Sequence, residues 1–390
     1  MEGYRMALFK AQNGKNYLIN VGNIIASGGE GDICTVQDYT AKVAKLFRAD
    51  TPVKKLQTLE NKITYMAQLY DHIPSNVRNT VSAQITWPEA ALFDNSGKFR
   101  GYIMQKVSGH ETLDCAYLES QRTKSNFTFG EKVIIAKNLC VAVNVMHSVL
   151  HCVVGDFNAK NIMVNTKSGT VYLVDSDSFH LRYTEEVRGR KVTGYMPTLV
   201  GRPEYLPKEL HDYVINQNAQ LDTLPQPSFN RESDLFGLAI HIFQLLMNGT
   251  HPYGLRINPA DRTDSFSVSK VDIGWVENIK KERYVYSKSP DVVKRILGYL
   301  PPKFAPSYEV IPDYLQPLFE RAFVINSESS IKLSRRSGDG KYYSDVTVRP
   351  SASEWYHTLD RFSKELKVCS VNPQHQYGRH LNKCPWCSLK

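Results

Sequence analysis

Hydrophobic and polar positions follow short-range patterns over the first third of the chain. The patterns predict short strands, which cover residues 17–21, 24–25, 33–36, 41–47, 90–93 and 101–107. A helix is predicted over residues 53–69, because apolar residues recur there at helical spacing. These elements predict a small sheet with one helix.

The pattern changes after Gly109. Residues 130–150 and 232–248 are long apolar stretches that predict buried helices, and residues 351–366 predict a last helix. Proline-containing, charged regions at 183–230 and 250–312 predict long ordered loops with short helices. The chain is therefore expected to be α+β, with a β-rich first part and a helical second part.

Composition narrows the class of protein. The 390 residues are 42% hydrophobic and 22% charged, which is typical of a soluble globular protein. The net charge of +9 is dispersed, so no specific nucleic-acid partner is predicted. Met1 to Lys15 lacks the apolar core of a signal peptide, and Leu235 to Met247 is too short to cross a bilayer. We expect no membrane span.

The cysteines are unevenly placed. Four of the seven are scattered, and three fall within the last 22 residues, which predicts a reducing, cytoplasmic setting and a metal site. Cys384 and Cys387 have the spacing of a zinc-knuckle half-site. Cys369 and His375 are the favoured remaining ligands, with His380 as the alternate. The sequence thus predicts a closed, structural Zn²⁺ site.

A second group of candidate functional residues, two carboxylates and a carboxamide, lies within residues 155–175. Asp156 and Asn161 lie five positions apart, and Asp175 follows 14 residues after Asn161. Phosphoryl transfer uses one carboxylate to accept a hydroxyl proton, and a carboxamide with a second carboxylate to hold Mg²⁺. The apolar runs around Gly169 predict a hairpin that returns Asp175 towards Asn161.

A complementary set of candidate phosphate-binding residues lies upstream of residue 155. The segment Gly28-Gly29-Glu30-Gly31 predicts a tight turn whose backbone N–H groups can approach phosphate. Lys45 ends a predicted strand, and Glu60 lies 15 residues later in the predicted helix. A strand lysine held by a helix glutamate is suited to clamping nucleotide phosphates.

The order of these features along residues 17–365 resembles that of the eukaryotic-like protein kinase superfamily. Three further matches support it: Gly201 to Glu209 resembles the end of an activation loop, Asp234 begins a buried helix, and Arg349 resembles the late arginine that pairs with Glu209. The resemblance implies a bilobal protein-kinase-like fold. Its implied parts are an N-lobe over 1–108, a C-lobe over 109–366 and a zinc-binding tail over 367–390.

The resemblance also implies residue roles. Asp156 would be the catalytic base, Lys45 and Glu60 the phosphate-clamping pair, and Asn161 and Asp175 the ligands of Mg²⁺ or Mn²⁺. ATP would contact loop, adenine-pocket and ribose positions, which are Gly28, Gly29, Gly31, Ile33, Val43, Met104, Gln105, Val107 and Glu111. The implied reaction is transfer of the γ-phosphoryl group to Ser/Thr hydroxyls of a protein, including autophosphorylation.

Several positions depart from the family pattern. Val154-Gly155 replaces the usual His-Arg, which argues against activation by loop phosphorylation. Asn158 stands where a lysine is usual, and Ser176 replaces the Phe of Asp-Phe-Gly. These departures keep two alternatives open: a pseudokinase scaffold that binds a partner through the zinc tail, and a small-molecule phosphotransferase.

One bacterial branch of Ser/Thr kinases is especially similar. That branch has Gly-Gly-Glu-Gly in its loop, Asp-x-Asp-Ser-Phe at the metal-binding Asp and a C-terminal Cys-Pro-Trp-Cys, and all three occur here, the last at 384–387. Its relatives are associated with stress or tellurium resistance. The resemblance implies a cognate phosphatase and a von Willebrand-type protein as partners.

Overall fold

The computed structural model describes residues 5–117, 127–187, 189–196, 201–211, 229–261, 274–324 and 348–387. The chain forms two compact units. The first comprises Met1–His110 and Tyr172–Asp177, and the second comprises Glu111–Val171 and Ser178–Lys390. The first unit therefore contains one short segment from later in the sequence, and this segment includes Asp175.

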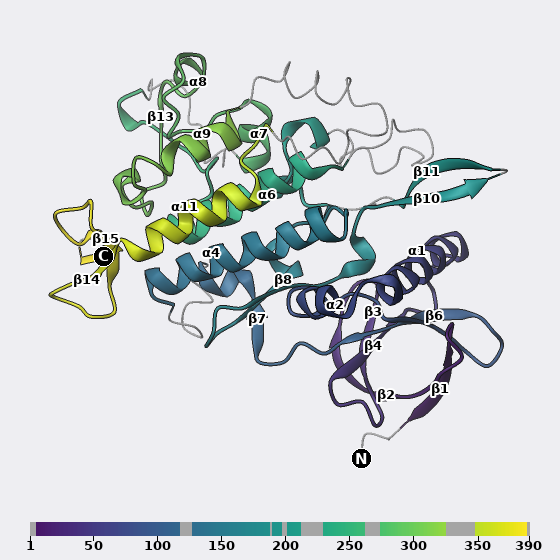
Figure 1. Cartoon of the computed structure of the whole chain (residues 1–390). Coiled ribbons are helices and arrows are strands. Elements are labelled where there is room, and N and C mark those ends of the chain that lie inside the picture. The colour runs from purple at the N-terminus through teal and green to yellow at the C-terminus, as the bar shows by residue number, and fades with distance from the viewer. Residues whose placement is uncertain are drawn as a thin grey trace. The chain divides into compact units, whose positions relative to one another are not determined.

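Six strands of the first unit close into a barrel in the order β1-β2-β3-β4-β6-β5 (Figure 1). They are β1 (Met6–Ala11), β2 (Asn16–Ser27), β3 (Gly31–Val36), β4 (Lys42–Phe47), β5 (Ala90–Phe93) and β6 (Phe99–Gln105). Alternate residues of these strands fill the interior, among them Phe9, Ile19, Cys34, Ala44 and Ile103. This inner set contains no charged side chain, as a closed barrel core requires.

Two glycines allow the strands of this barrel to approach closely. A Cβ atom on Gly31 would lie 2.3 Å from the Leu46 carbonyl oxygen. A Cβ atom on Gly101 would lie 1.9 Å from the Lys45 carbonyl oxygen. Both contacts are too short for any side chain, so β4 (Lys42–Phe47) needs glycine on each neighbouring strand.

Two helices, α1 (Val53–His72) and α2 (Ser75–Ser82), complete the first unit. α1 packs against β5 and β6. Its buried residues are Leu56, Leu59, Lys62, Ile63, Met66 and Ala67. Lys62 is the one cation in this buried row, and a buried cation requires a polar partner.

Three helices form the centre of the second unit: α4 (Phe129–Asn144), α6 (Arg231–Leu246) and α11 (Ala352–Lys364) (Figure 1). α4 packs against both others. Each begins with a capping box, in which a side-chain oxygen and a residue three positions later satisfy backbone N–H groups reciprocally. The boxes are Thr128–Glu131, Asn230–Ser233 and Ser351–Glu354.

One described helical stretch, Phe129–Val149, is long and apolar enough to cross a membrane by length and composition. Within the second unit, 61% of its most apolar window is buried, and α6 and α11 cover it. Such burial is also typical of a core helix in a globular domain.

Shorter strands and helices belong mostly to the second unit, and β7 and β9 each have residues in both units. The strands are β7 (His110–Thr112), β8 (Ile162–Asn165), β9 (Val171–Leu173), β10 (Leu181–Val187), β11 (Arg190–Met196), β12 (Arg256–Ile257), β13 (Tyr299–Leu300), β14 (Leu366–Val368) and β15 (Gln376–Gly378). The helices are α7 (Trp275–Lys280), α8 (Pro290–Arg295) and α9 (Gln316–Phe323).

The predicted mixture of helices and strands is confirmed, but the first unit has more elements than the predicted small sheet with one helix. β1 and α2 were not predicted, and pairing of β1 with β5 closes the sheet into a barrel. In the second unit, β10 and β11 form an antiparallel hairpin where a loop was expected. The bilobal layout and the domain boundaries stay predictions.

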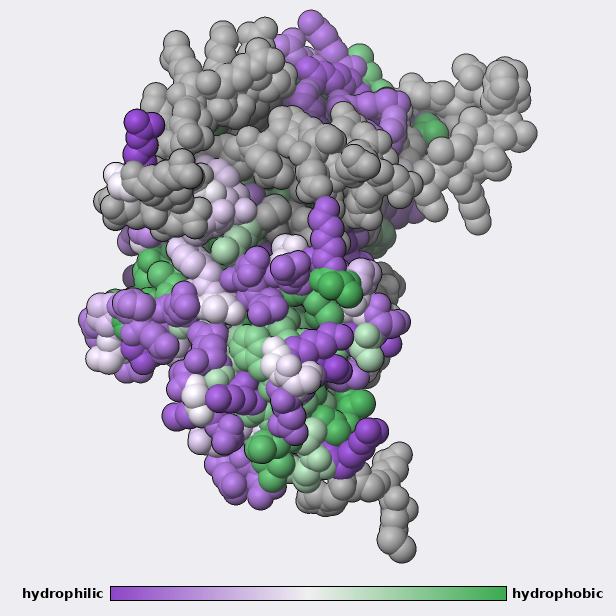
Figure 2. Space-filling view, turned by 90° about the vertical axis from the view of Figure 1, so that its right-hand side faces the viewer, coloured by the Kyte–Doolittle hydropathy of each residue, from purple (hydrophilic) through white to green (hydrophobic). Residues whose placement is uncertain are grey.

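The surface carries scattered apolar side chains. Among described residues, the most exposed are Val371, Val53 and Leu297, at 81%, 77% and 71%. They come from separate parts of the chain, and the face shown in Figure 2 has small hydrophobic groups between hydrophilic ones. Scattered exposure of this kind is normal and does not define a binding surface.

Candidate functional site

One face of the barrel wall carries several of the predicted nucleotide residues. In the antiparallel pairing, Lys45 lies opposite Ile33 on β3 and opposite Tyr102 on β6. Val43 lies opposite Met104. Directly opposed residues share a face, and so do residues two apart on one strand. Ile33, Val43, Lys45, Tyr102 and Met104 therefore share the outer face, because Ala44 lines the interior.

Lys45 is buried and is held by two carboxylates of the first unit. Its Nζ donates to Asp175 Oδ1 at 2.5 Å and to Asp177 Oδ1 and Oδ2 at 2.7 and 2.9 Å. The Tyr102 hydroxyl donates to Asp177 Oδ1 at 2.7 Å. The side chain of Asp177 is 0% exposed, whereas that of Asp175 is 35% exposed. Asp175 is thus the carboxylate that can reach a ligand.

Burial and neighbouring charges both shift the pKa values of Lys45, Asp175 and Asp177. Burial would lower the pKa of Lys45, but Asp177 first, then Tyr102 and Asp175, raise it well above its usual value. Burial, followed by the charge of Asp177, raises the pKa of Asp175 to about 6. Burial also opposes ionisation of Asp177, but Lys45 keeps the pKa of Asp177 below its usual range. Asp177 is therefore the fixed negative charge beside Lys45.

The predicted ion pair between Lys45 and Glu60 is not formed among the described residues. Glu60 lies on α1, but the hydrogen bonds of Lys45 to described residues go to Asp175 and Asp177. The α1 residue that reaches this cluster is Lys62, whose Nζ donates to the Asp177 carbonyl oxygen at 2.8 Å. Residues two apart on a helix point about 200° apart, so the burial of Lys62 directs Glu60 to another side.

The segment that carries both aspartates is tied to residues 84–86 of the first unit. Leu173 N donates to the Gln84 carbonyl at 2.8 Å, and Thr86 N donates to the Leu173 carbonyl at 3.0 Å. Ser176 is fully buried, and its hydroxyl donates to the Thr86 carbonyl at 2.7 Å. A serine at this position therefore anchors the segment by a hydrogen bond in place of aromatic packing.

The predicted glycine-rich turn joins β2 to β3. Gly28 N donates to the Gly31 carbonyl oxygen at 2.9 Å, which closes the turn. A Cβ on Gly29 would have no heavy atom within 4 Å among the described residues, so this backbone is open to a ligand. Glu30 pairs with Lys55 of α1 at 2.7 Å.

The remaining predicted nucleotide-binding positions lie at and after the end of β6. Gln105 ends this strand opposite Lys42, and Val107 lies two residues later; both are half-buried. Glu111 lies on β7 and belongs to the second unit. Asn161 likewise belongs to the second unit and Asp175 to the first, so the predicted closeness of these two metal ligands stays a prediction.

In the second unit, Asp156 and Asn161 contact each other. The Asn161 amide donates to the Asp156 carbonyl oxygen at 3.0 Å and to its Oδ2 at 3.2 Å. The other oxygen, Oδ1, is buried and has no hydrogen-bond partner among the described residues. A buried carboxylate oxygen without a donor is suited to accept a proton or hydrogen bond from a bound group.

Asp234 holds the backbone before Asp156. Its carboxylate accepts from Val154 N at 2.7 Å and from Gly155 N at 3.0 Å, and His147 Nε2 lies 2.9 Å from Oδ2. Asp234 is 1% exposed, so these are buried, charge-assisted bonds. Gly155 has a φ of +76°, a backbone conformation that glycine adopts without strain.

Neighbouring polar residues mostly support the loop. The Asn158 side chain accepts from Lys160 N at 2.9 Å and is buried, so it caps a short turn, whereas Lys160 is exposed. His241 Nε2 lies 2.9 Å from the Phe157 carbonyl oxygen, and burial lowers the pKa of His241 to about 4. A neutral His241 therefore hydrogen-bonds the backbone of the loop that carries Asp156.

The expected pairing of Arg349 with Glu209 is present. Both terminal nitrogens of Arg349 contact Glu209 Oε1, at 3.3 and 3.2 Å. The buried guanidinium also donates to the carbonyls of Ala322 and Glu232. The pair fixes the segment around Glu209 to the helical core.

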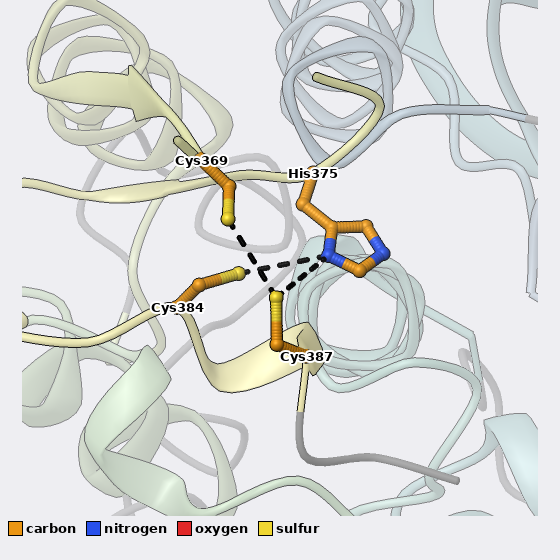
Figure 3. Close-up of side chains that lie close together, drawn as sticks. All are labelled: Cys369, His375, Cys384 and Cys387. Atoms are coloured by element: carbon orange, nitrogen blue, oxygen red, sulfur yellow. Dashed lines mark hydrogen bonds between the residues drawn. The ribbon is translucent and has the colours of Figure 1, made fainter. Parts of the chain in front are cut away.

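The tail brings together the four favoured zinc ligands (Figure 3). The ligand atoms of Cys369, His375, Cys384 and Cys387 all lie within 4.8 Å of one another. The Cys369 and Cys387 sulfurs are 3.6 Å apart, and His375 Nδ1 lies 3.7 and 3.5 Å from the sulfurs of Cys384 and Cys387. A tetrahedral Zn²⁺ would place two sulfurs about 3.8 Å apart and a sulfur and nitrogen about 3.6 Å apart. The donor set fits zinc.

Groups next to the cysteine–histidine cluster of the tail favour the binding of a cation. Backbone N–H groups of Asn372 and Val371 lower the pKa of the Cys369 thiol to about 7. Asn372 Nδ2 lies 3.3 Å from His375 Nε2, on the ring edge opposite the cluster, and so orients the imidazole. The alternate ligand His380 lies outside the cluster, with Nε2 2.9 Å from the Glu309 carbonyl oxygen.

The tail also contacts the start of α4. The Trp386 ring packs 5.0 Å from that of Phe129, and its N–H donates to the Gln376 carbonyl at 2.6 Å. Gln376 Oε1 accepts from Gly130 N at 2.9 Å. A Cβ on residue 130 would lie 2.1 Å from that oxygen, so a larger residue would displace the Gln376 side chain from this bond. The cluster is thereby connected to the core of the second unit.

Comparisons with known proteins bear on the reaction. No family model matches the sequence. The chain is 29% identical over 378 residues to Protein kinase YegI of Escherichia coli O157:H7 and 29% identical over 379 residues to Protein kinase YegI of Escherichia coli strain K12. Each match covers 95% of this chain and 49% of the relative, so the chain spans about half the length of the curated relatives it matches. Nearly the whole chain is therefore similar to proteins named as protein kinases.

Proposed function

We propose that this chain is an ATP-dependent protein kinase that phosphorylates Ser/Thr hydroxyls, including its own. The observation that carries the proposal is the outer barrel face, which places a buried, carboxylate-held Lys45 beside Ile33, Val43 and Met104. A nucleotide needs both properties, because its base favours apolar contacts and its phosphates require a fixed cation.

In the proposed reaction, each of these residues has a separate role. Lys45 stabilises charge on the phosphates, and the open backbone at Gly29 approaches them. Asp156 receives the proton of the substrate hydroxyl, and its Oδ1 has no hydrogen-bond partner among the described residues. Asn161 and Asp175 offer the oxygen ligands that Mg²⁺ prefers. Bound Mg·ATP supplies the phosphoryl group and neutralises its developing charge.

Similarity to the two named protein kinases supports the same reaction class. The match covers about half of each relative, so the activity, substrates and partners of a longer protein would not be described by this chain alone. The buried Ser176 and the Asp234 cradle support a catalytic loop and metal-binding segment that are both held in place.

Radiolabel transfer from [γ-³²P]ATP with Mg²⁺ tests the proposal, using the chain itself and a Ser/Thr-containing peptide library as acceptors. We expect transfer by wild type and a loss of about 10²-fold or more in Asp156→Asn, the scale of general-base catalysis. Asp313→Asn is the matched control, because Asp313 is exposed and distant in sequence. Phosphoamino-acid analysis should give phosphoserine or phosphothreonine.

Three outcomes would contradict the proposal. A thermal shift with Mg·ATP but no label transfer would indicate a pseudokinase scaffold. Transfer to small hydroxylated acceptors in preference to protein would indicate a small-molecule phosphotransferase. Equal rates of label transfer for wild type and Asp156→Asn would show that Asp156 is not the catalytic base.

We also propose that the Cys369, His375, Cys384 and Cys387 cluster holds one structural Zn²⁺. All four positions are filled by protein ligands, which leaves no open position for a substrate. Zinc would stabilise a tail whose own apolar core is small. Metal analysis of gently purified protein should find about one Zn²⁺ per chain, and finding none would refute the site.

A further inference from the structure

Asp177 has features that the proposed reaction leaves unexplained. Its carboxylate is fully buried and accepts Lys45 Nζ through both oxygens and the Tyr102 hydroxyl through one. Its backbone carbonyl accepts Lys62 Nζ. Strands β4 and β6 and helix α1 therefore all contribute a donor to one aspartate. Such a convergence is costly to bury unless each group is satisfied.

The side chains of Asp175 and Asp177 differ in their exposure to solvent. The Asp175 side chain is 35% exposed and can exchange Lys45 for a metal ion, whereas the Asp177 side chain is 0% exposed. If Asp175 engages Mg²⁺, Lys45 keeps only its bonds to Asp177 among those shown. A buried lysine needs at least one fixed anionic partner.

Glu60 does not supply that partner. It forms no ion pair with Lys45 among the described residues, although it lies on the helix that packs against β5 and β6. The buried row of α1 instead presents Lys62 to the Asp177 backbone. Moving Glu60 towards Lys45 would require α1 to rotate and withdraw Lys62 from that bond.

We infer that Asp177 is the positioning residue that anchors Lys45, the task that the kinase resemblance assigns to Glu60. The inference rests on the proposed function for its catalytic consequence, but the anchor itself rests on contacts within the first unit. Asp177 acts through Lys45 and does not touch the transferring group. The aspartate two residues after the metal-binding Asp175 thus replaces the helix glutamate.

The kinetic test compares Asp177→Asn with Glu60→Gln. We expect Asp177→Asn to lower kcat/KM for ATP by about 10²-fold, mostly through kcat, because a misplaced Lys45 fails to stabilise the transition state. The loss in Glu60→Gln should be at least about tenfold smaller. Asp71→Asn, an exposed aspartate on α1, is the matched control and should behave as wild type.

A conservative variant separates positioning from a merely structural role. Asp177→Glu keeps the charge and should recover part of kcat, while Asp177→Asn keeps the volume and should not. If Asp177→Asn does not fold, Tyr102→Phe replaces it, since it removes one donor to Asp177 and should lower kcat by up to about tenfold. A kcat equal to wild type in the folded variant tested would overturn the inference.

A double-mutant cycle tests the anchor without any activity. Urea midpoints are measured for Lys45→Met, Asp177→Asn and the double variant, and for the same cycle with Glu60→Gln. We expect non-additive shifts for 45 with 177 and additive shifts for 45 with 60. The reverse pattern would assign the anchor to Glu60. If wild type transfers no phosphate, the proposed function fails, yet the two cycles still decide which carboxylate holds Lys45.

Discussion

Replacing Asp234 by Asn would test how the loop before Asp156 is held. The Asp234 carboxylate accepts two backbone N–H groups, from Val154 at 2.7 Å and Gly155 at 3.0 Å, and contacts His147 at 2.9 Å. Asn has the same shape but only one acceptor oxygen. Whichever way the amide turns, at least one backbone N–H faces an NH₂ group and loses its acceptor.

The magnitude follows from these contacts. A hydrogen bond to a charged group contributes about 1.5–3 kcal/mol, and a buried donor left unsatisfied costs about 1–3 kcal/mol. Asp234 is 1% exposed, so water does not replace the lost bond. We expect a loss of about 3 kcal/mol in local stability, which corresponds to roughly 10²-fold faster exchange of the affected amide.

Hydrogen exchange with mass spectrometry measures this directly on peptides that contain Val154 and Gly155. Asp234→Asn is compared with wild type and with Asp313→Asn, which removes an exposed carboxylate. The phosphoryl-transfer rate should fall with Asp234→Asn, because the loop that carries Asp156 loses its support. Exchange at 154–155 equal to that of Asp313→Asn would refute the argument that Asp234 holds this loop.

Two further predictions concern acid stability and metal. Burial lowers the pKa of His241 to about 4, so the unfolded chain takes up a proton near pH 6.5 while the folded chain resists it down to about pH 4. Stability is therefore lost as the pH falls from 6.5 to 4, by about 3 kcal/mol for this residue, and urea midpoints of His241→Gln should fall less steeply over that range. Cys387→Ser removes one of the four clustered ligands, so its Zn²⁺ content should fall from about one per chain to near zero, with a shift in Trp386 emission as the tail leaves Phe129. Retention of a full equivalent of zinc would exclude Cys387 as a ligand.

Local patterns predicted the four longest described helices, five of the six barrel strands and the four clustered side chains of the tail. Apolar periodicity located α1, α4, α6 and α11 to within a few residues, since each buries one or more faces. The Cys-x₂-Cys spacing and a nearby histidine predicted the four clustered ligands of the tail. These signals are local, because they depend on a few neighbouring residues of the chain.

Pairings between distant segments were harder to predict. β1 closes the barrel by pairing with β5, about 80 residues later, and nothing in either short strand specifies that partner. Lys62, Tyr102 and Asp177 were missed as site residues. Two signals were available: a second aspartate after Asp175, and a lysine in the apolar row of α1.

The sequence by itself identified the candidate residues for phosphate, metal and zinc binding, and the order in which they occur. Only the tertiary structure decided which carboxylate holds Lys45. Spacing favoured Glu60, but the register of β4 with β6 and the burial of Lys62 bring Asp177 and Tyr102 to Lys45. The physical reason is that a buried charge takes the partner that packing makes available, and packing depends on contacts between residues far apart in the chain.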